Sequence, residues 1–222
     1  MDLAIRIAQW FSLTTLIVAF IISMMHRNKR DLLPIQIYII ISMLLNLFIN
    51  FLAFFPENGS YNNVGEAAVN INSIFEISLI YNFLYVKIRS NKFRNSMIIL
   101  LIFYISICLI LWTHYKNTLG SFMPDLFGIE GLLIIIPCFF YIFEIFKSDL
   151  AIDFKTDANF IVACGILFYF SITTPICFCW YNLYYIYLGF NKVLILSIAV
   201  FFIILIISFM KAYLCPIRNL QK

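Results

Sequence analysis

The sequence predicts an all-α protein, a polytopic membrane bundle of seven transmembrane helices. Of its 222 residues, 64% are hydrophobic and only 12% are charged, whereas charged residues make up about a quarter of a typical soluble domain. The apolar residues gather into seven runs, each near the length of about 20 helical residues that a bilayer requires. Because the segments between these runs are short, we expect them to be connectors within a single transmembrane domain over residues 1–222.

Polar or charged connectors separate the seven predicted spans. The spans cover approximately residues 7–25, 33–55, 67–86, 96–113, 127–146, 160–180 and 193–210. A basic cluster that begins at His26 follows the first span rather than preceding it. A secretory signal peptide carries its positive charge in front of the apolar run. We therefore expect the first helix to be retained.

The basic residues predict the orientation of the bundle. Of the 15 Lys and Arg residues, only Arg6, Lys116 and Lys192 fall on one predicted side, and the others fall on the opposite side. Cytoplasmic connectors carry an excess of Lys and Arg. The sequence thus predicts an N-terminus outside and a C-terminus inside, with membrane lipids as the immediate surroundings and no nucleic acid as a partner.

The fifth span is unusual because it combines a carboxyl with a helix breaker. At helical spacing, Glu130, Pro137, Tyr141 and Glu144 share one face. An ionisable side chain at membrane depth costs about 3 kcal/mol on insertion scales and seldom faces lipid. We expect Glu130 to face the interior, within reach of the third or sixth span. Glu144 lies three residues before Lys147 and is expected to be a solvated helix end.

Two glycines flank the carboxyl of the fifth span. Gly128 and Gly131 lie on either side of Glu130. Small residues let neighbouring helices approach closely in membranes. Close packing against this part of the fifth span is therefore predicted.

Polar residues in the other spans extend the candidate site. The candidate ligand-binding residues are Glu130, Glu76, Asn72, Asn46, Asn50, Tyr141 and Thr173. One interpretation is structural: the two glutamates pin the third and fifth helices together, and the Ser42, Asn46 and Asn50 series forms interhelical hydrogen bonds. The other interpretation is an outward-facing polar cavity for a ligand or a proton. If both glutamates share that cavity, their repulsion is expected to keep at least one protonated near neutral pH.

Motifs for catalysis or metal binding are missing from the sequence. The two histidines, His26 and His114, are predicted to lie on opposite sides of the membrane. The chain has no Gly-rich phosphate loop, no zinc-protease motif and no serine-hydrolase motif. A retinal protein needs a lysine in mid-membrane. The only lysine of the last span is Lys211, which lies at its inner end. We therefore predict no catalytic residue, no metal site and no cofactor.

Two segments carry a resemblance to known proteins. They are the run Phe-Gly-Ile-Glu-Gly-Leu-Leu from Phe127 and the run Asn-Phe-Ile-Val-Ala-Cys-Gly-Ile-Leu-Phe-Tyr-Phe-Ser from Asn159. In these runs the chain resembles small, largely uncharacterised bacterial seven-helix membrane proteins, which are often encoded beside sensor histidine kinases. The resemblance implies an accessory sensing or signalling role in the bacterial inner membrane, with a histidine kinase or another membrane signalling protein as partner.

Two functions are consistent with these features. The first is a non-enzymatic membrane sensor or signalling subunit, with a polar intramembrane pocket and with output through a partner protein. The alternative is a small transporter or proton-linked carrier that uses Glu76 and Glu130 as titrating groups. Transporters built from repeats place broken helices at corresponding positions. Here Pro137 and Pro175 break the fifth and sixth spans without counterparts in the first half, which favours the sensor.

Overall fold

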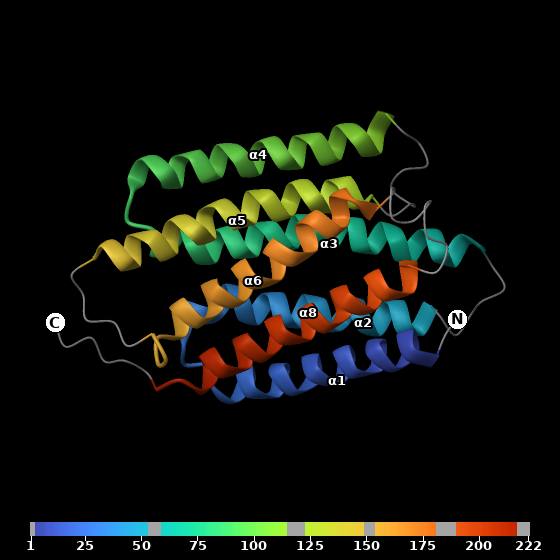
Figure 1. The fold of residues 1–222 in the computed structure, drawn as a ribbon, viewed down its shortest axis with the longest axis horizontal. Helices are drawn as coiled ribbons and strands as arrows, with labels where there is room; N and C mark the ends of the chain where they lie inside the picture. The colour runs from blue at the N-terminus through green and yellow to red at the C-terminus, as the bar shows by residue number, and fades with distance from the viewer. Residues whose placement is uncertain (1–2, 53–58, 115–122, 149–153, 181–189, 217–222) are drawn as a thin grey trace.

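A computed structural model describes residues 3–52, 59–114, 123–148, 154–180 and 190–216, and these form a bundle of helices (Figure 1). The elements are α1 (Leu3–Met25), a 3-10 turn (Arg30–Leu32), α2 (Leu33–Leu52), α3 (Gly59–Lys87), α4 (Asn91–His114), α5 (Pro124–Lys147), α6 (Ala158–Phe178) and α8 (Phe190–Leu214). Seven of these helices are long and apolar enough to cross a membrane, and the described part of the chain contains no strand. The predicted all-α membrane bundle is confirmed.

The helices extend beyond some of the predicted spans. α3 begins at Gly59 rather than near residue 67, and α4 begins at Asn91 rather than near residue 96. Hydropathy marks where a helix enters the apolar layer, whereas backbone hydrogen bonding continues into polar residues such as those that open α3. The tyrosines at 181, 184, 185 and 187 follow the sixth span, as is typical of an interfacial aromatic belt, and they lie outside the described residues.

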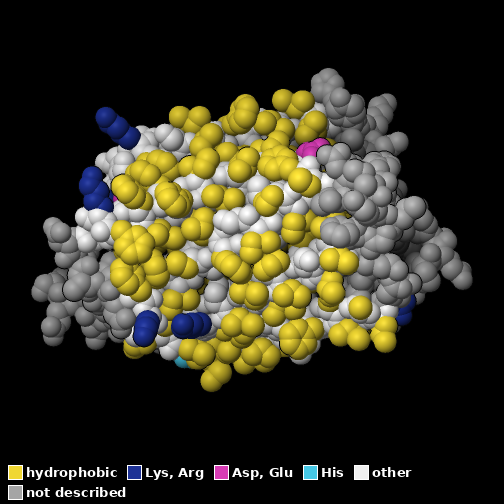
Figure 2. Space-filling view, viewed as in Figure 1, with side chains coloured by type: hydrophobic (Ala, Val, Ile, Leu, Met, Phe, Trp, Pro, Cys, Tyr) yellow, Lys and Arg dark blue, Asp and Glu magenta, His cyan; other side chains and the backbone are white. Residues whose placement is uncertain are grey.

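The helices pack side by side along the long axis of the molecule (Figure 1). The closest neighbours are α5 with α6, α6 with α8, α1 with α8, and α2 with α3. α4 lies at the edge, packs mainly against α3 and α5, and exposes apolar side chains such as Ile99 and Phe103. Figure 2 shows a broad hydrophobic middle on the viewed face, with Lys and Arg side chains toward the ends. This surface is what a bundle surrounded by lipid requires.

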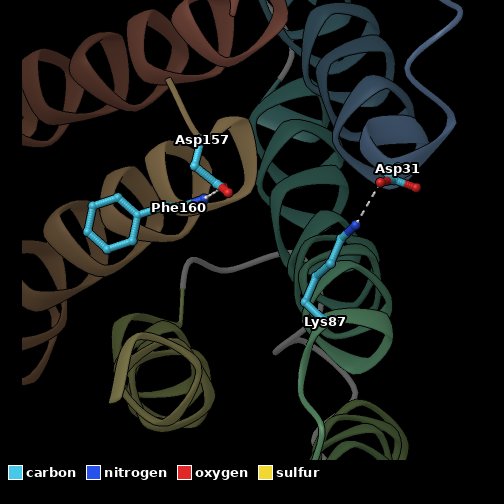
Figure 3. A network of polar contacts seen from close by, with 4 residues as sticks. All are labelled: Asp31, Lys87, Asp157 and Phe160. Carbon is cyan, nitrogen blue, oxygen red and sulfur yellow. Dashed lines mark hydrogen bonds and ion pairs between the residues drawn. The ribbon is translucent and has the colours of Figure 1, made fainter. Parts of the chain in front are cut away.

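Contacts between connectors hold the basic end of the bundle together. The Lys87 ammonium, at the end of α3, lies 3.2 Å from the Asp31 carboxylate between α1 and α2 (Figure 3). Asp157 caps α6 by accepting the backbone N–H of Phe160 at 2.8 Å (Figure 3). The ion pair brings the connector between α1 and α2 beside the end of α3, in agreement with the predicted partition of charge, whereas the cap is local to the start of α6. The side of the membrane that this end faces stays a prediction.

Glu144 lies near the end of α5 and is half-exposed, as expected for a helix end, but its carboxylate also has backbone partners. Its carboxylate accepts the backbone N–H of Arg89 at 2.9 Å and that of Ser90 at 3.2 Å. Both residues immediately precede α4, where backbone donors lack intrahelical acceptors. The end of α5 lies beside this turn, so Glu144 satisfies donors that hydropathy and spacing along a single helix do not reveal.

The last turn of α8 is fastened to the connector between α1 and α2. Lys29 donates to the carbonyl of Ala212 at 3.0 Å and to the carbonyl of Cys215. Tyr213 donates its hydroxyl to the Leu32 carbonyl at 2.8 Å. Burial lowers the pKa of Lys29, and the nearby Cys215 partly offsets this effect. A cation at a helix C-terminus satisfies carbonyls that have no intrahelical donor, so the first and last helices are joined at this end.

Pro137 leaves one carbonyl of α5 without its usual helical donor, and a side chain of α3 donates to that carbonyl instead. Pro137 has no N–H, and its ordinary helical acceptor would be the carbonyl of Leu133, four residues earlier. The hydroxyl of Tyr81 on α3 donates to this carbonyl at 2.8 Å. The helix break in α5 is thereby stabilised by a side chain of its neighbour.

Glycines set the closest approach between α5, α6 and α8. A Cβ atom at Gly131 would collide with the Thr174 hydroxyl of α6, and one at Gly165 would collide with the Ser208 hydroxyl of α8. At Gly128, an added Cβ would lie 2.8 Å from the Phe178 ring. The predicted close packing at Gly128 and Gly131 is confirmed, although side chains of α6, rather than its backbone, fill the space.

Candidate functional site

A cavity of about 210 Å³ lies between α2, α3, α5, α6 and α8. Its polar side chains are Tyr38, Ser42, Asn46, Asn72, Glu76, Tyr169 and Thr173. Phe127, near the start of α5, and Cys177, near the end of α6, also line it. Both positions are far from the basic connectors along their helices, so the cavity occupies the half of the bundle away from the basic end.

Glu76 is the acidic side chain of the cavity lining. The Tyr38 hydroxyl donates to its Oε1 atom at 2.8 Å, across the contact between α2 and α3. Tyr38 is 3% exposed and packs edge-to-face against Phe209 of α8, with ring centroids 5.7 Å apart. The packing orients the tyrosine, and the tyrosine orients the carboxyl beside the cavity.

Glu130 lies deeper than Glu76. It faces the interior, as the sequence predicts, and is 0% exposed, but it does not line the cavity. Among the described residues, no group forms a well-aligned hydrogen bond with either of its carboxyl oxygens. Ser73 on α3 is close enough to interact with the carboxyl, but its hydroxyl is 2.8 Å from that of Tyr104 on α4. Burying a carboxyl with so little hydrogen bonding is costly.

The two carboxyls are close enough to repel each other. Tyr169, on α6, lines the same cavity as Glu76. The interior therefore holds a pair of acidic groups on α3 and α5, of which Glu76 reaches the cavity.

The other predicted site residues divide into two groups. Asn46, Asn72 and Thr173 line the cavity together with Glu76. Asn50 does not line it, and Tyr141 lies near the basic end, beside Arg89 and Asp157, on a separate cavity of about 130 Å³. The single polar face of α5 therefore meets different surroundings at different depths, because one helix spans the whole thickness of the bundle. Whether any of these residues binds a ligand stays a prediction.

In the part of the chain that the structure describes, Asn46 and Asn50 donate within α2 rather than to a neighbouring helix, contrary to what their spacing suggested. Asn46 donates to the Ser42 carbonyl at 2.9 Å, and Asn50 donates to the Asn46 carbonyl at 2.8 Å. Short polar side chains in a helix can reach the carbonyl four residues earlier. Each of these bonds uses one N–H of the amide, and Asn46 also lines the cavity.

Sequence reasoning missed Tyr38 and Tyr169. With 13 tyrosines and 25 phenylalanines in the chain, an aromatic residue by itself carries no signal. Spacing could have found both: Tyr38 precedes Ser42 by four residues, and Tyr169 precedes Thr173 by four. Residues four apart share a helix face, so each tyrosine continues a face that was already marked as polar.

No metal centre is present in the described ranges, where no three His, Cys, Asp or Glu side chains come together as ligands. Comparison with known proteins finds no family model, no curated protein and no solved structure that matches this chain. The function is therefore argued from the cavity and its acidic pair.

Proposed function

We propose that this integral membrane protein is a non-enzymatic sensor or signalling subunit that binds a small ligand in the cavity beside Glu76. The observation that supports this proposal is the carboxyl itself, held by Tyr38 at the edge of a cavity inside the bundle. A carboxyl that only joined two helices would need no adjoining space. Ionisable residues within membrane spans usually mark a ligand or ion site.

Binding can be converted into a signal because the cavity contacts several helices. Its lining comes from α2, α3, α5, α6 and α8, and α5 is interrupted by Pro137 next to the Tyr81 contact. A ligand that favours one arrangement of these helices shifts the population toward it. We propose that a partner protein carries the output.

The partner that we propose is a histidine kinase or another membrane signalling protein of the bacterial inner membrane. This choice follows from the resemblance of the Phe127 and Asn159 segments to proteins encoded beside such kinases. The bare apolar faces of α4 provide area for a helix of a partner as well as for lipid.

A small transporter is the second candidate, and the acidic pair is the observation that favours it. Glu130 is buried in the interior outside the cavity lining that contains Glu76, and a second interior carboxyl is what a proton relay would use. It ranks second because the prolines inside described helices, Pro137 and Pro175, both belong to the second half of the chain.

One experiment separates the two candidates. The protein is purified in mild detergent from cells that express it at native level, and co-purifying membrane proteins are identified. A stoichiometric kinase, together with altered kinase output in a Glu76→Gln strain, would support the sensor. Solute uptake by proteoliposomes of the pure protein, abolished by Glu130→Gln, would instead establish the transporter.

A further inference from the structure

We propose that the ligand of this cavity is a small organic ammonium ion. The inference rests on the proposed function, because it names the chemical class of ligand for the same cavity. Charge, aromatic lining and size each support it.

The charge of the lining favours a cation. Glu76 is the carboxyl of the cavity, and no Lys, Arg or His is among the described lining residues. Glu130 is a second acidic group in the same interior, outside the cavity lining. An anion would meet these carboxyls without a counter-charge, whereas a cation would supply the partner that a carboxylate in a low-dielectric interior requires.

The aromatic side chains favour an organic cation over a metal ion. Five of them line the cavity: Tyr38, Phe127, Tyr169, Phe170 and Phe202. Tyr169 packs edge-to-face against Phe170 and Phe202, with centroids 5.0 Å and 6.1 Å apart. The rings therefore stand at steep angles to one another, as walls rather than as a flat stack. Aromatic walls beside a carboxylate are the arrangement that recognises quaternary ammonium groups.

The size of the cavity suits such a ligand. An apolar cavity of about 150 Å³ admits benzene, and this one measures about 210 Å³. The volume of a trimethylammonium group with a short substituent is of this order. A larger lipid-like molecule would need space that the described lining does not enclose.

Choline and its uncharged analogue, in which a carbon atom replaces the nitrogen, test the ligand class. Both are titrated into the purified full-length protein by calorimetry, in a sodium-free buffer of constant ionic strength. We expect choline to bind roughly ten-fold tighter than the analogue, because only choline gains the ion pair and the cation–π contacts. Glu76→Gln should remove most of this preference. Glu66→Gln, on the same helix but outside the cavity lining, should leave it unchanged.

Aromatic substitutions complete the test. Tyr169→Phe keeps the ring and should retain choline binding, whereas Tyr169→Leu should weaken it several-fold; gel filtration and circular dichroism show that each variant is folded. If the two compounds bind equally and both lose affinity in Tyr169→Leu, the cavity binds a ligand but the proposed ammonium class is wrong. Displacement of choline by sodium at equal concentration would assign the site to inorganic cations and overturn the proposal. No binding of either compound would also overturn the ligand class, while co-purification of a partner would still test the proposed function.

Discussion

The Tyr81 hydroxyl on α3 donates to the Leu133 carbonyl on α5. In a regular helix this carbonyl would accept the N–H of residue 137, which Pro137 lacks. A buried carbonyl without a donor costs free energy comparable to a lost hydrogen bond. The contact therefore allows α5 to carry a proline in its interior and links the break to α3, the helix of Glu76.

Removing this hydroxyl should destabilise the bundle. We expect Tyr81→Phe to lower the free energy of unfolding by about 1 kcal/mol, the order measured for side-chain hydrogen bonds in membrane proteins. In a Pro137→Ala background, the restored N–H can bond the Leu133 carbonyl, so the same change should cost much less. Unfolding in mixed micelles with increasing dodecyl sulfate measures both values. An equal loss in the two backgrounds would mean that Tyr81 does not replace the missing N–H.

Gly131 is expected to tolerate no larger side chain. Gly131→Ala places a methyl against the Thr174 hydroxyl and 3.2 Å from the Thr174 Cβ, and overpacking of this kind costs about 1–3 kcal/mol. Adding Thr174→Ala should recover part of the loss. Gly65→Ala is the matched control: the added methyl meets Leu52 at an ordinary 3.8 Å, so helix propensity should make this change neutral or stabilising. Melting temperatures in one detergent compare the three variants, and similar values for Gly131→Ala and Gly65→Ala would contradict the packing.

Glu144 and Asp31, two acidic residues at the basic end, should differ in how much they stabilise the start of α4. Glu144→Gln weakens two charge-assisted hydrogen bonds to the Arg89 and Ser90 backbone and is expected to destabilise the start of α4 by about 1 kcal/mol. Asp31→Asn removes an ion pair whose carboxylate is 74% exposed, and such pairs contribute little. Hydrogen exchange of the first turn of α4, followed by mass spectrometry, should accelerate in Glu144→Gln alone. Equal acceleration in both variants would show that general charge, rather than capping, holds this turn.

The two interior glutamates should respond oppositely to an apolar replacement. Glu130→Met removes a buried carboxyl that has no well-aligned partner, and we expect a higher melting temperature. Glu76→Met deprives the Tyr38 hydroxyl of its acceptor, so we expect a lower one. A destabilised Glu130→Met protein would indicate that this carboxyl supports the fold, and the case for keeping it as part of a functional site would fail.

Much of the fold was predictable because the membrane imposes it. Seven apolar helical runs follow from the requirement that every backbone group inside the bilayer be satisfied within a helix, and the basic connectors at one end follow from the excess of Lys and Arg in cytoplasmic connectors. The interior position of Glu130 was predictable for the same energetic reason. These features depend on single helices in a known solvent.

Features that depend on which helices meet were not predictable. The capping by Glu144 requires the end of α5 to lie beside the α3–α4 turn, and the Tyr81 contact requires α3 to pass the proline of α5. The split between Asn46, which lines the cavity, and Tyr141, which does not, also requires the packing of several helices. Spacing along one helix predicts a shared face but not what that face meets at each depth.

Cys177 offers the most direct test of an acidic cavity, because it lines the cavity while Cys179, two residues later, is exposed. Variants that retain only one of these cysteines are treated with cationic and anionic thiosulfonate reagents of similar size. We expect the ratio of cationic to anionic rates to be several-fold higher at Cys177 than at Cys179, and Glu76→Gln to reduce it at Cys177 alone. The same ratio at both positions, unchanged by Glu76→Gln, would contradict an acidic cavity and, with it, the proposed ligand site.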